Sequence, residues 1–274
     1  MSSGFQRLGK NIDGYFGETL DLRAVLEACR AAGFSYGWRV EEVPAPPKPS
    51  LLALTRPAQV SSGTVARCYI SAGIHGDEPA GPLAVRQLLQ ENQWPPEVEL
   101  YVMPCLNPTG FVLNRRENDK GTDLNRQYLQ PKAEETLAHI NWLSRQPNFD
   151  LCLGLHEDWE SHGFYVYELN LDDRPSLAQG MIDAASKICP IDLSEIIEGR
   201  PSQGGIIRPS LDPRTRPQWP ESFYLLAQKT RLSYTLEAPS DFVLSVRVAA
   251  LVAAVRAAVQ SLPDRKPNSG SQAD

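Results

Sequence analysis

Short apolar runs alternate along the chain with stretches in which apolar residues fall at helical spacing. Six runs are apolar enough for buried strands: "LLALTRP" (51–57), "ARCYISAGI" (66–74), "VELYVMP" (98–104), "FDLCLGL" (149–155), "GFYVYEL" (163–169) and "RLSYTLEA" (231–238). Helical periodicity covers 18–33, 81–92, 133–145, 175–188 and 241–262. Because strands and helices alternate, we expect an α/β fold with a mixed, mostly parallel twisted sheet flanked by helices.

The segments between these elements predict one domain. "VPAPPKPS" (43–50) is typical of a stiff proline-rich connector, and 1–49 would hold the first helix and this connector. Residues 198–220 combine glycines, prolines and arginines, which favours a long surface loop of the kind that is often functional. We expect a single domain over 1–262 and a disordered tail over 263–274.

Composition excludes several classes of protein. The 274 residues are 42% hydrophobic and 22% charged, which is ordinary for a globular chain with a sizeable core. A net charge of −6 without a basic patch argues against nucleic-acid binding. No apolar leader and no apolar run of about 18 residues is present, so no membrane partner is expected. Five scattered cysteines without a CxxC pair favour a reducing compartment, and we expect a cytoplasmic protein.

Histidine and carboxylate side chains come at the ends of three predicted strands. In "ISAGIHGDEPAG", His75 and Glu78 follow the second strand; His156 follows the fourth, and Glu237 ends the last. Ligands of open α/β sheets collect at the carboxyl ends of strands. Two imidazoles and a carboxylate make a catalytic zinc set with one position open for water. The sequence therefore predicts one Zn²⁺ ion bound by His75, Glu78 and His156.

Two further groups could act beside such an ion. Glu237 is the candidate for the carboxylate that takes a proton from the metal-bound water. The loop "LNRRENDKGTDLNR" supplies Arg115, Arg116 and Arg126, with Asn125 beside the last. An arginine there could polarise a scissile carbonyl, stabilise its oxyanion or grip a substrate carboxylate.

The ordered set "HGDE", "NPTG", "RRE", "DLNR", a strand-end histidine and "YTLEAP" resembles the zinc carboxypeptidase family, M14, over about residues 50–262. The resemblance implies the ligand set above and a hydrolase. It implies that Glu237 is the general base and that Arg116, in preference to Arg115, polarises the carbonyl. Asn125 and Arg126 match the pair that binds the terminal carboxylate of the substrate.

The chain departs from the family pattern in two places. The gap from Arg116 to Asn125 is short, and "DLNR" is similar to the succinylglutamate desuccinylase and aspartoacylase branch. That branch usually carries an additional β-rich domain, whereas one helix and a tail follow Glu237 here, which favours a carboxypeptidase-like or murein-peptide amidase-like enzyme. Tyr224 is the candidate for the substrate-covering tyrosine; the alternative is a core aromatic of the helix "SFYLLAQK".

These patterns predict hydrolysis of an amide bond next to a free carboxylate in a small peptide. The alternatives are an N-acyl-amino-acid deacylase that uses the same metal site and a non-catalytic binding protein on the same fold. Arg200, Arg208, Arg214 and Arg216 in the 198–220 loop suggest an acidic substrate, or are solvated surface charges. The sequence carries no signal for an oligomeric state.

Overall fold

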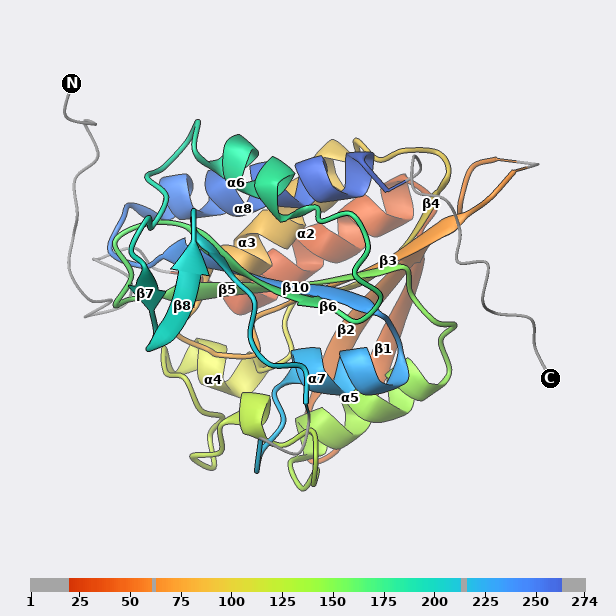
Figure 1. Ribbon diagram of the computed structural model, residues 1–274. Coiled ribbons are helices and arrows are strands. Elements are labelled where there is room, and N and C mark those ends of the chain that lie inside the picture. Colours follow the sequence, from red (N-terminus) through yellow and green to blue (C-terminus); the bar gives the residue numbers. More distant parts are fainter. Residues whose placement is uncertain (1–19, 61–62, 213–215, 263–274) are drawn as a thin grey trace.

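The fold is a mixed β-sheet between two layers of helices (Figure 1). The computed structural model describes residues 20–60, 63–212 and 216–262; the predicted tail, 263–274, lies outside them. The described residues form ten strands: β1 (Arg39–Ala45), β2 (Lys48–Arg56), β3 (Ala66–Ala72), β4 (Val98–Met103), β5 (Leu151–Asp158), β6 (Tyr165–Asn170), β7 (Ile196–Ile197), β8 (Arg200–Gln203), β9 (Ile206–Ile207) and β10 (Leu232–Pro239). The helices are α2 (Leu22–Ser35), α3 (Ala80–Glu91), α4 (Pro108–Val112), α5 (Glu134–Ser144), α6 (Ala178–Ala185), α7 (Glu221–Gln228), α8 (Leu244–Gln260) and a 3₁₀ turn (Leu124–Arg126).

Parallel strands form the centre of the sheet, whose order is β1-β2-β4-β3-β5-β10-β6-β9-β8-β7. The neighbouring strands β4, β3, β5 and β10 run parallel to one another. At one end of the sheet β2 pairs antiparallel with β4, and β1 pairs antiparallel with β2. On the other side β6 pairs antiparallel with β10. The mixed α/β architecture is confirmed, with more antiparallel pairing at the two ends than predicted. The carboxyl ends of β3, β5 and β10 share one edge, which brings their following loops together.

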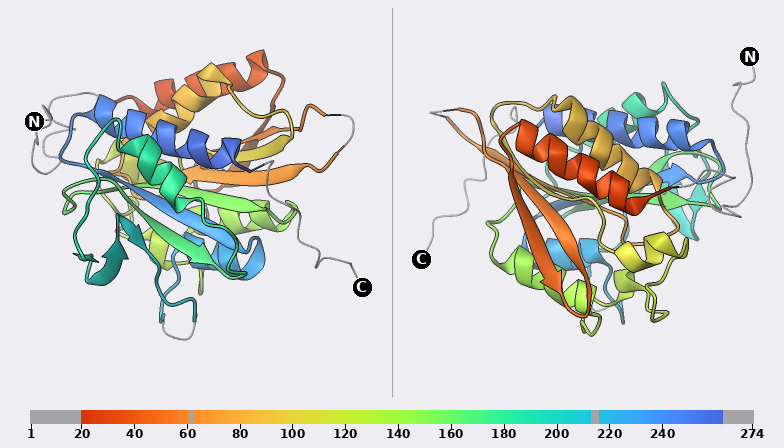
Figure 2. Two further views of the ribbon diagram at one scale, coloured as in Figure 1. Left: turned by 45° about the horizontal axis from the view of Figure 1, so that its top comes forward. Right: turned by 180° about the vertical axis from the view of Figure 1, so that it is seen from behind.

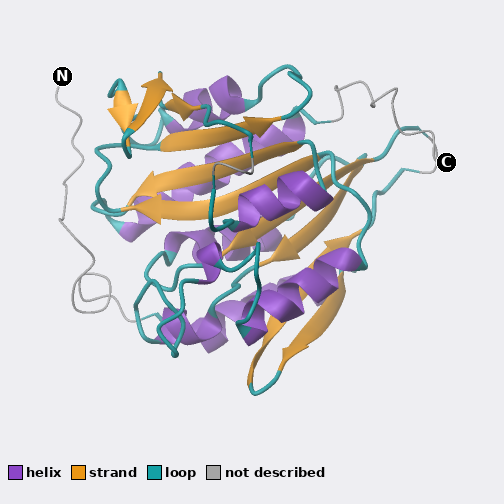
Figure 3. Cartoon of the chain, turned by 60° about the horizontal axis from the view of Figure 1, so that its bottom comes forward, coloured by secondary structure: helices purple, strands orange, loops and turns teal. Residues whose placement is uncertain are grey.

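Each face of the sheet has its own apolar core. Helices α2, α3, α6 and α8 cover one face, and the main core lies beneath them (Figure 1). α4, α5 and α7 cover the other face, which comes forward in Figure 3. The second core there is rich in aromatic rings, with Tyr69, Trp142 and Phe149 in contact. Burial on both faces explains why the central strands are nearly continuous apolar runs.

The prediction of a connector over 43–50 is wrong. These residues form the turn and the adjoining strand ends of the β1–β2 hairpin, which is visible in the right view of Figure 2. Pro46 and Pro47 lie in the turn between the paired residues Ala45 and Lys48, where no ladder N–H is required. The 198–220 segment is only partly loop, because β8 and β9 form a hairpin within it. Among the described helices, none is long and apolar enough to cross a membrane.

Candidate metal centre

The turn between β3 and α3 carries the first two predicted ligands, His75 and Glu78. Its close path depends on Gly76, where a Cβ atom would lie 1.9 Å from the carbonyl carbon of Gly110. Gly110 belongs to the "NPTG" motif, and Asn107 of the same motif caps α4 and donates from Nδ2 to the Ile74 carbonyl. The two motifs therefore pack directly on each other and hold the turn in one conformation.

Three buried side chains converge at the end of the central strands. His75 Nδ1 lies 2.5 Å from Glu78 Oε1, and His156 Nδ1 lies 2.9 Å from Glu78 Oε2. One ligand atom from each residue lies within 4.8 Å of the others, a grouping that no other set of described residues makes. His156 belongs to β5 itself rather than to the loop after it. Two imidazole nitrogens on one carboxylate, all nearly excluded from water, form a donor set that fits a zinc ion.

The charges within this group support one another. Burial lowers the pKa of His75, but the Glu78 carboxylate and Asp123 outweigh burial and raise this pKa to about 9. The same carboxylate raises the pKa of His156 against burial. Burial raises the pKa of Glu78, and the two imidazoles more than reverse that effect. Glu78 is therefore an ionised candidate ligand, and a metal ion would compete with protons for the imidazoles.

Asp123 links the metal group to Arg116. Its Oδ1 lies 3.5 Å from His75 Nε2, and its Oδ2 accepts a hydrogen bond of 2.9 Å from Arg116 Nε. Arg116 Nη1 lies 3.9 Å from Glu78 Oε1, so this guanidinium stands directly beside the candidate ligands. Asp123 begins the "DLNR" motif, but no role for it was predicted from the sequence. Its position suits a residue that orients a metal-binding imidazole.

Asn125 and Arg126 lie in the 3₁₀ turn and line the same cavity as the candidate ligands. Asn125 Oδ1 accepts a 2.8 Å hydrogen bond from the backbone N–H of Glu221, so its orientation leaves the side-chain NH₂ for another acceptor. Arg115 is not brought to the cavity: its Nη2 donates to the Asn118 carbonyl. The structure thus separates the two adjacent arginines.

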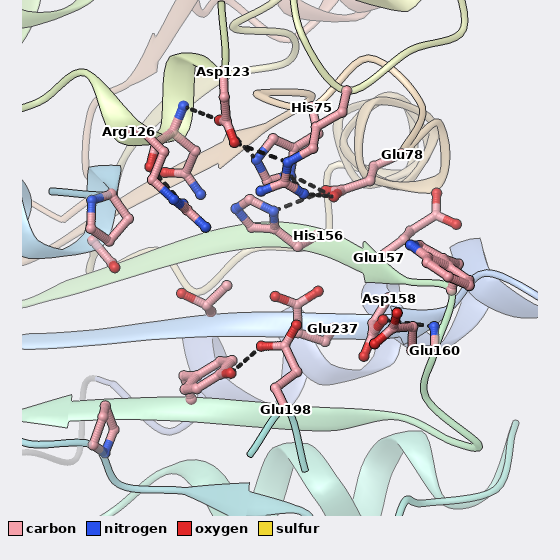
Figure 4. Close-up of a pocket in the computed structure, with 18 of the residues that line it drawn as sticks. His75, Glu78, Asp123, Arg126, His156, Glu157, Asp158, Glu160, Glu198 and Glu237 are labelled. Carbon is pink, nitrogen blue, oxygen red and sulfur yellow. Dashed lines mark hydrogen bonds and ion pairs between the residues drawn. The ribbon is translucent and has the colours of Figure 1, made fainter. Parts of the chain in front are cut away.

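Glu237 lies on β10 directly beside His156 on β5, because the two residues are partners in the parallel register. Figure 4 shows Glu237 between His156 and Glu198. Burial raises the pKa of Glu237 well above the usual range; the charge of His156 opposes this, and Glu78, Glu198 and Asp158 reinforce it. A half-buried carboxyl group with a raised pKa at this place suits proton transfer.

The cavity has a volume of about 510 Å³ and contains the candidate ligands, Arg116, Asn125, Arg126 and Glu237 in its walls. Tyr224 is not among the described residues that line it. Its ring packs 5.7 Å from that of Tyr128 and belongs to the second core, as the alternative interpretation predicted. Tyr167 lines the cavity instead, and its hydroxyl donates to Glu198.

A buried ion pair between Glu157 and Arg247, which was not predicted from the sequence, lies next to the candidate ligands. Glu157 follows His156, and its Oε1 accepts a 2.6 Å hydrogen bond from the N–H of Ala80, where α3 begins. Glu157 Oε2 accepts from Arg247 Nη1 of α8 at 2.5 Å, and neither side chain is exposed. This carboxylate therefore joins the turn of the first two candidate ligands to the strand of the third.

Comparisons with known proteins agree with this geometry. A family model for the succinylglutamate desuccinylase/aspartoacylase catalytic domain matches residues 64–190. Carboxypeptidase SOL1 from Arabidopsis thaliana is 32% identical over a match that covers 37% of this chain, and the match spans only 24% of that relative.

Three solved structures have the same fold. A proposed metallopeptidase from Shewanella amazonensis has a TM-score of 0.76 at 25% identity, over 88% of this chain and 93% of that one. A metallo-carboxypeptidase from Burkholderia cenocepacia has a TM-score of 0.64 at 21% identity, over 89% and 70%. The tripeptide-bound cell shape determinant Csd4 from Helicobacter pylori has a TM-score of 0.58 at 20% identity, over 78% and 55%. The chain is thus similar in fold to metallopeptidases, and part of its sequence is similar to a carboxypeptidase and to the succinylglutamate desuccinylase/aspartoacylase catalytic domain.

Proposed function

We propose that this chain is a zinc-dependent hydrolase of the carboxypeptidase type, which cleaves the amide bond next to the free carboxylate of a small peptide. The observation that carries this proposal is the meeting of three potential metal ligands, the Glu237 carboxyl group and Arg116 in a single cavity. The five cysteines are free and buried, which suits the reducing cytoplasm, and we include that location in the proposal.

The metal would be held by Nδ1 of His75, Nδ1 of His156 and the carboxylate of Glu78. A zinc ion bound there supplies a Lewis acid and lowers the pKa of a bound water to ~7. Asp123 holds the ring of His75 in place. Because these donors are buried, the protein excludes bulk water from the metal face that they cover.

The remaining residues bind and orient the substrate. The Asn125 NH₂ group and the Arg126 guanidinium hold the terminal carboxylate by charge-assisted hydrogen bonds. Arg116, kept in position by Asp123, polarises the scissile carbonyl. Glu237, beside His156, takes a proton from the attacking water and returns it to the leaving amine.

An N-acyl-amino-acid deacylase is the second candidate. The observation that favours it is the family-model match over 64–190, since that model describes desuccinylases and aspartoacylases. Both reactions hydrolyse an amide next to a carboxylate, so the same residues would serve either one. A non-catalytic binding protein is the third possibility, and a turnover assay separates it from the other two.

The test combines metal content with activity. Purified protein, loaded with zinc and dialysed, is analysed by mass spectrometry and then assayed on C-terminal peptides and N-acyl-amino acids. We expect one zinc per chain in the wild type and its loss in His75→Ala, with activity falling together with metal. His162→Ala, a change at an exposed histidine, is the matched control and should keep both. Full zinc occupancy in His75→Ala would refute the ligand assignment.

A further inference from the structure

Three arginines in the cavity have no carboxylate partner in the part of the chain that the structure describes. Arg126, Arg200 and Arg216 all line it, and no carboxylate oxygen of a described residue lies within 4.0 Å of their nitrogens. Arg116, by contrast, is paired with Asp123. Arg200 and Arg216 are partly buried, and partly buried cations that lack counter-charges are unusual, because desolvation is normally offset by a paired anion. The charges of Arg200 and Arg216 are therefore not offset by a paired carboxylate of a described residue.

Arg200 and Arg216 come from different segments of the chain, and a stacking contact holds the second of them. Arg216 Cζ lies 4.1 Å above the ring centroid of Phe223 on α7, a stacking contact that fixes the guanidinium plane. Arg200 begins β8 immediately after Glu198 and Gly199, whose φ angles of 48° and 69° form the turn from β7. Both side chains are only partly exposed.

The three charges lie close enough to repel one another. Burial lowers the pKa of Arg216, and the positive charges of Arg200 and Arg126 lower it further. Figure 4 shows Arg126 across the cavity from Asp158 and Glu160. Arg200 and Arg216 thus lie in the same cavity as Asn125 and Arg126, which are proposed to hold the terminal carboxylate.

We propose that Arg200 and Arg216 form a second anion-binding subsite, which selects substrates whose C-terminal residue has an acidic side chain. This inference rests on the proposed function, because Asn125 and Arg126 orient the terminal carboxylate. A side-chain carboxylate on the same residue would reach the two extra guanidiniums and neutralise them. Planar guanidiniums suit this recognition, since they can bind a carboxylate with two parallel hydrogen bonds.

The experiment compares two substrates of nearly equal shape, N-acetyl-Ala-Glu and N-acetyl-Ala-Gln, with zinc-loaded protein. We expect kcat/KM to favour the glutamate substrate about 10- to 100-fold, the range for a charged pair in a partly buried site. In the double variant Arg200→Met/Arg216→Met this ratio should fall to near one. Arg39→Met, at a largely exposed arginine on β1 at the other end of the sheet, should leave the ratio unchanged.

The outcomes separate this inference from the proposed function. Equal hydrolysis of both peptides, unchanged in the double variant, would overturn the subsite and leave the hydrolase intact. A preference for an acidic acyl group, tested with N-succinyl-Gln against N-acetyl-Gln, would overturn its placement on the C-terminal side. If no substrate is hydrolysed, the proposed function fails, and calorimetry with N-acetylglutamate and N-acetylglutamine tests the subsite by itself. Tighter binding of N-acetylglutamate that is lost in the double variant supports the subsite. Equal affinity for the two compounds overturns it.

Discussion

The buried ion pair of Glu157 and Arg247 offers the sharpest test of how the site is supported. Both side chains are inaccessible to solvent, and the joining atoms are 2.5 Å apart. Arg247 Nε and Nη2 find no acceptor among the described residues, so Glu157 is its main partner. Arg247→Met keeps most of the apolar stem and leaves Glu157 with the Ala80 N–H and the Ser240 hydroxyl.

Removing one partner of a buried pair costs about 3–5 kcal/mol, because an uncompensated charge stays behind. We expect Arg247→Met to lower the free energy of unfolding by about this amount. We expect a similar loss in Glu157→Gln. The double variant Glu157→Gln/Arg247→Met should lose less than the sum of the two, since no isolated charge remains. In chains of this size such a loss lowers the melting temperature by about 10 °C.

Urea unfolding followed by tryptophan fluorescence measures these free energies, and chelator competition measures zinc affinity. Zinc affinity should fall about 10- to 100-fold in either single variant, because the pair holds the strand of His156 against the ligand turn. The control is Arg256→Met on the same helix, whose partner Glu91 is partly exposed and whose ion pair should contribute less than about 1 kcal/mol. A loss below about 1 kcal/mol in Arg247→Met, or strict additivity in the double variant, would refute this reasoning.

Three further predictions concern other parts of the molecule. Asp123→Asn should weaken zinc binding about 10- to 100-fold in chelator competition, and an unchanged affinity would exclude its orienting role. Burial lowers the pKa of His139 to about 3, below 6.5, so the unfolded chain binds more protons between these values and stability falls as pH falls below 6.5. From pH 7 to 5 the wild type should lose about 2 kcal/mol more unfolding free energy than His139→Gln, and equal losses would contradict this. Gly76→Ala should destabilise by about 3 kcal/mol or more in thermal unfolding, whereas Gly180→Ala in α6, where a Cβ meets nothing within 4 Å, should stabilise slightly.

The central part of the fold was predictable because its strands are buried on both faces. β3, β5 and β10 appear in the sequence as apolar runs, and the helices that cover them show clear periodicity. The ends of the sheet were not predictable in the same way. Prolines 44, 46, 47 and 49 concealed the β1–β2 hairpin, and β7 and β9 have only two residues each, too few for a periodic pattern.

The residues of the candidate site were also predictable only in part. His75, Glu78, His156 and Glu237 were identifiable because the carboxyl ends of the central strands must meet, and the structure brings them together. Three further residues were not predicted, namely Asp123, Glu157 and Arg247. Their contacts join elements that are far apart in the sequence, and no local sequence pattern indicates such contacts. Two interpretations of Tyr224 stayed open, because the sequence of a short helix does not say which side faces a cavity, and the structure fits the core position.

β10 enters the sheet between β5 and β6, although it follows both in the chain. A nascent chain on the ribosome therefore holds all three candidate metal ligands, on β5 and the turn after β3, before the strand with Glu237 exists. Until β10 is inserted, β5 and β6 each present an unpaired edge, which is a hazard for aggregation. The candidate metal ligands and Glu237 would thus come together only when β10 is inserted. During biosynthesis the chain would therefore be able to bind the metal before it could catalyse the reaction.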